Sequence, residues 1–253
     1  MAAKPPVVLI HGACSQPAHF DAWRRMFADA GHDCTVPALP GHAPSNRTTL
    51  RRSGFDAYLD AMRDAIKAVG GRPVLVGHSL GALVARMLAT EGGVAALVLV
   101  APLPAGRVPM PARALPAFAM AAPFVLAGLP FRPPRAAVLR LALHHLPPAE
   151  QADVADGFVA ESGRAYRELV FGRAHVGRRE VRCPVLILHG DADRLVPVSV
   201  GEGIARKHDA ALEIFAGEGH WLIAPSLVPR VGIAALRWLD GLPTRWARRR
   251  QLR

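Results

Sequence analysis

The chain has 253 residues, of which 51% are hydrophobic and 20% are charged. This length and composition suit one globular domain with a sizeable core and argue against a disordered chain. The three cysteines are an odd number and argue against a disulfide framework. The apolar run before His11 is too short for a signal peptide, and prolines interrupt the apolar stretch 115–131. We therefore expect a cytoplasmic protein with no transmembrane segment.

The formal net charge is +11, and residues 245–253 contribute five arginines and no acid. One interpretation of this basic tail is a weak contact with an anionic surface. The other, which we favour, is a solvated basic terminus, because short basic tails are common and unspecific. No nucleic-acid-binding motif accompanies the tail, so we expect no nucleic-acid partner.

Strand and helix patterns alternate along most of the chain. The predicted strands lie near 7–11, 34–37, 73–77, 95–100, 184–189 and 211–216, and the predicted helices near 18–30, 54–69, 79–91, 198–209 and 224–240. Several of the strands are apolar throughout, which is typical of parallel strands buried on both faces. The sequence therefore predicts an α/β fold with a doubly wound, mostly parallel sheet.

The alternation stops between about residues 103 and 180. This segment is rich in Pro, Ala, Arg and Leu, with proline pairs at 133–134 and 147–148. Such a pattern indicates several short helices broken by turns. Because the segment separates two predicted strands of one sheet, we expect a helical insertion within a single domain that spans residues 1–253.

Residues 77–81 read Gly-His-Ser-Leu-Gly, a G-x-S-x-G pattern between a predicted strand and a predicted helix. In that setting the serine sits on a very tight turn. A side chain at Gly77 or Gly81 would collide with the neighbouring strand or helix. The turn exposes the Ser79 hydroxyl at a helix N-terminus, where developing negative charge is favoured. Ser79 is therefore the candidate nucleophile.

A nucleophilic serine needs a base and an acid that orients the base. Asp191 and Asp193 follow the predicted strand 184–189, and His220 follows the last predicted strand. His220 is the candidate base because a histidine pKa lies near operating pH. Either aspartate could orient it on this evidence alone.

Developing negative charge on a substrate oxygen also needs hydrogen-bond donors. The first predicted strand leads into His11 and Gly12, a place where one backbone donor is expected. The other donor is expected from the residue after the nucleophile. The candidate oxyanion-hole donors are the backbone N–H groups of Ala13 and Leu80.

Taken together, these motifs make the chain resemble the α/β-hydrolase-fold serine hydrolases of the esterase and lipase type, over nearly its whole length. The matching pieces are His-Gly at 11–12, Pro-Gly-His at 40–42, G-x-S-x-G at 77–81, G-x-x-D at 190–193 and Gly-His at 219–220. The resemblance implies that Asp193 is the acid and that Asp191 caps a loop. It also implies that the insertion at 103–180 is a cap over the active site, and that no cofactor is needed.

The resemblance implies hydrolysis of small-molecule carboxylic esters through an acyl-enzyme, and the apolar insertion favours lipophilic substrates of short to medium acyl chain. Two alternatives stay open. One is carbon–carbon bond hydrolysis or hydroxynitrile-lyase-like chemistry, because the opening at 11–14 also resembles that branch; the insertion contains no lysine, which weakens the lyase interpretation. The other, less favoured, is a slow ligand-binding homologue.

Apolar residues of the insertion, together with the residue after His220, are candidates for contact with substrate. They are Phe118, Met120, Phe124, Phe131 and Trp221. Packing of the insertion on the core explains the first four equally well, and Trp221 could simply anchor its loop.

We expect no metal site. His144 and His145 are the only adjacent histidines, and neighbours on a helix do not face the same way. No carboxylate or cysteine stands at ligand spacing from them.

Overall fold

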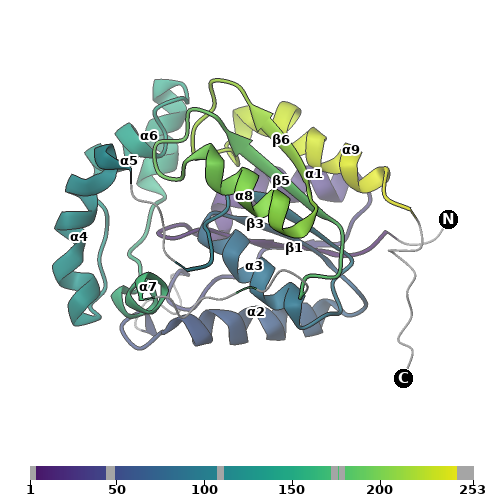
Figure 1. Ribbon diagram of the computed structural model, residues 1–253, viewed down its shortest axis with the longest axis horizontal. Coiled ribbons are helices and arrows are strands. Elements are labelled where there is room, and N and C mark those ends of the chain that lie inside the picture. The colour runs from purple at the N-terminus through teal and green to yellow at the C-terminus, as the bar shows by residue number, and fades with distance from the viewer. Residues whose placement is uncertain (1–3, 44–48, 107–110, 172–175, 177–179, 244–253) are drawn as a thin grey trace.

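The computed structural model describes residues 4–43, 49–106, 111–171, 176 and 180–243. The predicted basic tail at 245–253 lies outside the described residues. Six parallel strands form one sheet in the order β2-β1-β3-β4-β5-β6, with helices on both of its faces (Figure 1). The strands are β1 (Val7–Ile10), β2 (Cys34–Thr35), β3 (Val74–His78), β4 (Ala96–Val100), β5 (Val185–Gly190) and β6 (Ala211–Phe215). The helices that flank the sheet are α1 (Asp21–Asp29), α2 (Phe55–Val69), α3 (Leu80–Thr90), α8 (Val198–His208) and α9 (Ile233–Asp240).

The central strands are buried on both faces, as their apolar sequences predict. In β1, Val7 and Leu9 pack toward α1 and α9, whereas Val8 and Ile10 pack toward α2, α3 and α8. Because successive side chains of a strand point to opposite faces, each strand serves two cores. The predicted doubly wound parallel sheet is confirmed.

The predicted helix at 224–240 is wrong in its first half. Pro225–Leu227 form a 3₁₀ turn and Val228–Gly232 a π-helical turn before α9 begins. Pro229 has no backbone N–H to donate, which disfavours a regular helix here. Gly232 also lies close against α1, since a Cβ there would be 2.6 Å from the Met26 sulfur. Contact with a neighbouring helix is invisible in a local pattern.

The described residues between β4 and β5 form four α-helices. They are α4 (Leu115–Ala127), α5 (Arg135–Leu141), α6 (Pro148–Asp156) and α7 (Gly163–Val170). Figure 1 shows them together at one end of the molecule, beside the sheet rather than in its flanking layers. They therefore stand where a substrate cavity can form between them and the strand ends.

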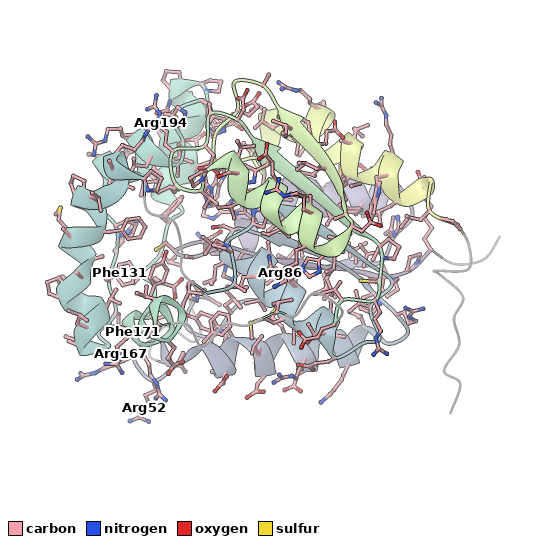
Figure 2. All side chains as sticks on the ribbon, viewed as in Figure 1. Arg52, Arg86, Phe131, Arg167, Phe171 and Arg194 are labelled. Atoms are coloured by element: carbon pink, nitrogen blue, oxygen red, sulfur yellow. The ribbon has the colours of Figure 1, made fainter. Side chains whose placement is uncertain are left out.

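Apolar side chains fill the layers on both faces of the sheet. Among the described residues, no helix is both long and apolar enough to cross a bilayer. Figure 2 shows Arg52, Arg167 and Arg194 at the periphery, whereas Arg86 of α3 lies inside. Arg86 is only 2% exposed, and burial lowers its pKa to about 10. Its charge persists at neutral pH, at a cost to folding.

The close approach of α3 to β1 gives a stability prediction. We expect Gly81→Ala to destabilise the fold by at least about 1–3 kcal/mol, because a Cβ at Gly81 would lie 2.1 Å from the backbone oxygen of Ile10. Gly203→Ala in α8 is the matched control. There the nearest atom to a Cβ is the end of the Arg206 side chain at 4.0 Å. We expect that change to stabilise by about 0.5–1 kcal/mol. Urea unfolding of both variants checks the pair, and equal effects would contradict it.

Candidate active site

Ser79 occupies the sharp turn between β3 and α3. Its backbone has φ 52° and ψ −113°, a strained conformation for a residue with a side chain. A Cβ at Gly77 would lie 2.4 Å from the Gly81 oxygen, so both glycines of the motif are sterically required. The predicted strand–turn–helix setting of this motif is confirmed. The turn places the Ser79 hydroxyl at the carboxyl end of the sheet and at the N-terminus of α3.

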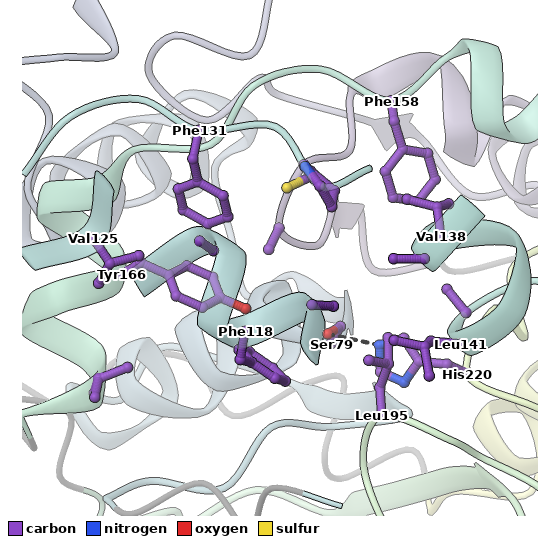
Figure 3. A pocket seen from close by; sticks show the side chains of 18 of the residues that line it. Ser79, Phe118, Val125, Phe131, Val138, Leu141, Phe158, Tyr166, Leu195 and His220 are labelled. Carbon is purple, nitrogen blue, oxygen red and sulfur yellow. Dashed lines mark hydrogen bonds between the residues drawn. The ribbon is translucent and has the colours of Figure 1, made fainter. Parts of the chain in front are cut away.

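A chain of hydrogen bonds joins three of the predicted residues. The His220 Nε2 lies 2.9 Å from the Ser79 Oγ (Figure 3). The His220 Nδ1 lies 2.7 Å from Oδ2 of Asp193. The other carboxylate oxygen of Asp193 accepts the backbone N–H groups of Leu195 and Val196, at 2.8 and 2.9 Å. These bonds fix the carboxylate against the imidazole.

The charges in this chain follow from its contacts. Burial favours the neutral acid at Asp193, but the adjacent His220 and the accepted hydrogen bonds outweigh burial and hold the pKa of Asp193 below its ordinary value. The carboxylate is therefore ionised and accepts a hydrogen bond from the Nδ1–H of His220. With Nδ1 protonated, the neutral imidazole has Nε2 free to accept the Ser79 proton.

His78 holds the loop that carries His220 through a hydrogen bond to its backbone. The His78 Nε2–H donates to the backbone oxygen of His220 at 3.0 Å. Burial lowers the pKa of His78 to about 3, so this histidine is neutral. Trp221 packs on the His78 ring, with the two ring centres 4.9 Å apart. Both side chains therefore anchor the loop.

Asp191 lies in the same loop as Asp193 but makes a different contact. Its Oδ1 accepts the backbone N–H of Gly217 at 2.7 Å. The structure thus brings Asp193, and not Asp191, within hydrogen-bond distance of His220. The contact of Asp191 is that of a residue that caps a loop.

The peptide that carries the Ala13 N–H is held by His11. The Leu39 N–H donates to the His11 Nε2 at 3.0 Å, which leaves Nδ1 to donate to the Gly12 oxygen at 3.0 Å. Burial, followed by the charge of His42, lowers the pKa of His11 to about 3, which keeps this tautomer neutral. Ala13 borders the cavity described below. Leu80 is the first residue of α3, where backbone N–H groups have no partner within the helix.

Ser79 and His220 line a cavity of about 300 Å³ between the strand ends and the α4–α7 helices. Its walls are mostly apolar, and Figure 3 shows Phe118, Phe131 and Phe158 around it. The hydroxyl of Tyr166 points into the cavity toward the Ser79 side (Figure 3). The sequence did not point to Phe158, in the loop after α6, or to Tyr166, on the short helix α7, because their placement depends on the tertiary fold.

The predicted substrate-contact residues separate into two groups. Phe118, Phe131 and Trp221 line the cavity. Met120 and Phe124 do not; they face solvent, with 62% and 45% of their surfaces exposed. The helical period explains the difference, since Phe118 and its cavity-facing neighbours at positions 121, 122 and 125 share one face of α4, and Met120 and Phe124 lie off it. For these two residues the prediction is corrected.

Cys14 also borders the cavity, beside Ala13. Burial and the nearby Glu161 carboxylate raise its pKa well above the ordinary value. The thiolate is the nucleophilic form of cysteine, and the raised pKa disfavours that form at Cys14. Cys14, Cys34 and Cys183 are free thiols.

The histidine pair lies in a turn after α5 and not on a helix, which corrects the helical placement assumed above. The His144 and His145 rings pack against each other, 5.3 Å apart, and a Cβ at Gly219 would meet both. They support the loop before His220. In the described part of the chain, no three His, Cys, Asp or Glu side chains gather as metal ligands would.

Comparison with known proteins places this fold and motif order in one family. The family model described as "Alpha/beta hydrolase family" matches residues 7–236. The chain belongs to that family. Across the alpha/beta hydrolases one scaffold supports many reactions, so the substrate has to be argued from the site.

Relatives and solved structures similar to this alpha/beta hydrolase include esterases and lipases. Over 237 residues it is 31% identical to a pimeloyl-[acyl-carrier protein] methyl ester esterase from Aromatoleum aromaticum, covering 86% of this chain and 91% of that protein. A shorter match, 32% identical over 75 residues, covers 30% of this chain and 27% of a pyrethroid hydrolase from Sphingobium wenxiniae. The crystal structure of a monoacylglycerol lipase from Paleococcus ferrophilus superposes with a TM-score of 0.74 at 22% identity, covering 93% of this chain and 95% of that one.

Proposed function

We propose that this protein is a carboxylic ester hydrolase that works through a covalent acyl-enzyme on Ser79, with lipophilic substrates of short to medium acyl chain. The observation that supports this most is the hydrogen-bonded chain from Ser79 through His220 to Asp193 at the wall of an apolar cavity. The esterase relative that matches along most of the chain agrees with it. Small-molecule esters are the substrates that a cavity of this size fits.

In the first half of the reaction, His220 takes the Ser79 proton through Nε2 as the Oγ attacks the ester carbonyl. The carbonyl oxygen becomes an oxyanion that the backbone N–H groups of Ala13 and Leu80 stabilise. Asp193 keeps the imidazole in its Nδ1–H tautomer and stabilises the imidazolium. The intermediate collapses, and His220 protonates the departing alcohol.

In the second half, water attacks the acyl-enzyme. His220 accepts a proton from that water, and the second oxyanion occupies the same backbone donors. Collapse of this intermediate returns the proton to Ser79 and releases the carboxylic acid. Every proton transfer uses a side chain already in place, and no cofactor takes part.

The helices α4 to α7 act in this proposal as a cap that supplies the hydrophobic wall. Phe118, Phe131 and Trp221 contact the lipophilic part of the substrate. The lyase alternative receives no specific support, since the described residues around the cavity include no lysine, and carbon–carbon bond hydrolysis on the same residues stays the alternative. Nitrophenyl esters test the proposal directly. We expect a burst of nitrophenol equal to the enzyme concentration when deacylation is slow, and wild-type protein without turnover or burst would overturn it.

The size of the apolar cavity predicts a chain-length preference. We expect nitrophenyl esters of about six to eight acyl carbons to be hydrolysed at least as well as acetate, because each buried methylene contributes about 0.8 kcal/mol of binding. Ala121 lines the cavity, whereas Ala119 is exposed on the other face of α4. Ala121→Leu should therefore shift kcat/KM toward acetate, and the matched control Ala119→Leu should not. A strict acetate preference in the wild type would contradict the assignment of the cavity as an acyl site.

A further inference from the structure

A second carboxylate lies buried near the active site and has no place in the mechanism above. Glu161 precedes α7 and pairs through its backbone with Phe131, at 2.8 and 3.0 Å. Its side chain is 0% exposed. Burying an ionised carboxylate costs several kcal/mol unless hydrogen bonds and opposite charge compensate it. The identity of its partners therefore indicates what the residue does.

Four donors converge on the two oxygens of Glu161. Oε1 accepts the Tyr58 hydroxyl at 2.5 Å and the Ser162 N–H at 2.7 Å. Oε2 lies 3.1 Å from the Cys14 N–H, which it accepts, and 3.2 Å from Nε2 of His42. A carboxylate has about four lone-pair sites, so Glu161 is fully hydrogen-bonded.

Glu161 and His42 form an ion pair. Burial raises the pKa of Glu161, but His42 and the accepted hydrogen bonds outweigh burial, and the pKa lies below its ordinary value. At His42 burial lowers the pKa, and the Glu161 charge outweighs it and raises the pKa. Nδ1 of His42 lies 3.1 Å from the Pro40 oxygen, so both ring nitrogens face oxygen acceptors. An imidazolium, with a proton on each nitrogen, suits that position.

The contact with Cys14 connects this ion pair to residues 11–14, the loop after β1 that carries the Ala13 N–H and is called the oxyanion loop below. Cys14 has φ 55°, a left-handed conformation that costs about 1–3 kcal/mol for a residue with a side chain. Both of its peptide groups are held by the same short segment: its N–H by Glu161, and its oxygen by the Val159 N–H at 2.8 Å. A local bond, from the Ser15 N–H to the Gly12 oxygen at 3.3 Å, closes the same turn, and the two bonds from the segment 159–161 add to it.

The Ala13–Cys14 peptide, whose N–H Glu161 accepts, adjoins the Gly12–Ala13 peptide, which carries the Ala13 N–H. His11 fixes the Gly12–Ala13 peptide through the Gly12 oxygen, and Glu161 fixes the following Ala13–Cys14 peptide. Two held peptide planes restrict the direction of the Ala13 N–H, and Ala13 borders the cavity that Ser79 also lines. We infer that Glu161 is a positioning residue, which sets the oxyanion-hole donor of Ala13 by holding the Cys14 peptide from the cap segment 159–161. This inference rests on the proposed function.

The test is Glu161→Gln, which keeps the shape but replaces one acceptor oxygen with an NH₂ group that must face a donor. We expect kcat for nitrophenyl esters to fall by about 10- to 100-fold, less than the 10²- to 10³-fold typical of deleting an oxyanion donor, with KM within about two-fold. Phosphonylation of Ser79 by a nitrophenyl phosphonate, whose P=O oxygen uses the same donors, should slow in parallel.

Glu168→Gln is the matched control. Glu168, on α7, also accepts a backbone N–H, that of Phe55 at 2.7 Å, but it does not contact the oxyanion loop. We expect it to lower the melting temperature without changing kcat. If Glu161→Gln fails to fold, Tyr58→Phe removes one of the four donors and should lower kcat several-fold with KM unchanged.

The outcomes separate the inference from the function. If wild-type protein hydrolyses esters and Glu161→Gln, or Tyr58→Phe in its place, keeps the wild-type kcat and phosphonylation rate, the positioning role is wrong and the function stands. A loss of kcat equal in Glu161→Gln and Glu168→Gln would also overturn it, since general loosening would then be the cause. Wild type that neither hydrolyses nor reacts at Ser79 overturns both.

Discussion

Ser79→Ala is expected to lower kcat for nitrophenyl esters by about 10⁶-fold, the loss typical of removing a triad nucleophile. The Ser79 Oγ is the only atom removed, and alanine can occupy the same turn, so the sheet and the cavity should remain. The nitrophenol burst should vanish with turnover, because no acyl-enzyme can form. Stopped-flow assays measure the burst and steady-state assays measure kcat, over the same series of substrate concentrations.

The control for this variant is Ser162→Ala. Ser162 is buried and its hydroxyl caps α7 by accepting the Ala165 N–H, but it has no contact with His220. We expect it to lose about 0.5–2 kcal/mol of stability and to keep its burst. If pure Ser79→Ala retained more than a few per cent of wild-type turnover, another nucleophile would have to be sought.

The sheet, and the loops that bring His220 and an aspartate to Ser79, could be predicted from the sequence because they depend on local signals. A strand that is apolar throughout has to be buried on both faces, and the G-x-S-x-G turn has glycines at two positions where a side chain would meet backbone. The loop after β5 and the loop after β6 then meet at one edge of a parallel sheet, since all its strands end there. That places His220 and the loop with both Asp191 and Asp193 near Ser79, whereas the choice of Asp193 over Asp191 comes from the family resemblance.

Glu161 could not be found in this way. It is one of six acidic residues in the segment 103–180, and no motif surrounds it. Its inferred positioning role depends on contacts with Tyr58 and Cys14, which lie 103 and 147 residues away along the chain. Contacts of that sequence separation have no periodic signal. The same limit applies to Phe158 and Tyr166, and to the orientation of α4, whose apolar residues on both faces hide the direction of the cavity.

Asp193→Asn is expected to lower kcat by about 10⁴-fold with little change in KM, by analogy with loss of the orienting acid in other serine triads. The N–H groups of Leu195 and Val196 require an oxygen acceptor, so the asparagine Oδ1 stays with them and its NH₂ group turns to His220. Nδ1 of His220 must then accept, which moves the imidazole proton to Nε2. An Nε2–H cannot take the proton of Ser79.

Asp191→Asn is the matched control. Its side chain contacts the Gly217 N–H, which the asparagine oxygen can still accept, so we expect its kcat within about two-fold of wild type. Steady-state kinetics of the two variants decide between the aspartates, and a larger loss at Asp191 would mean that Asp193 only supports its loop.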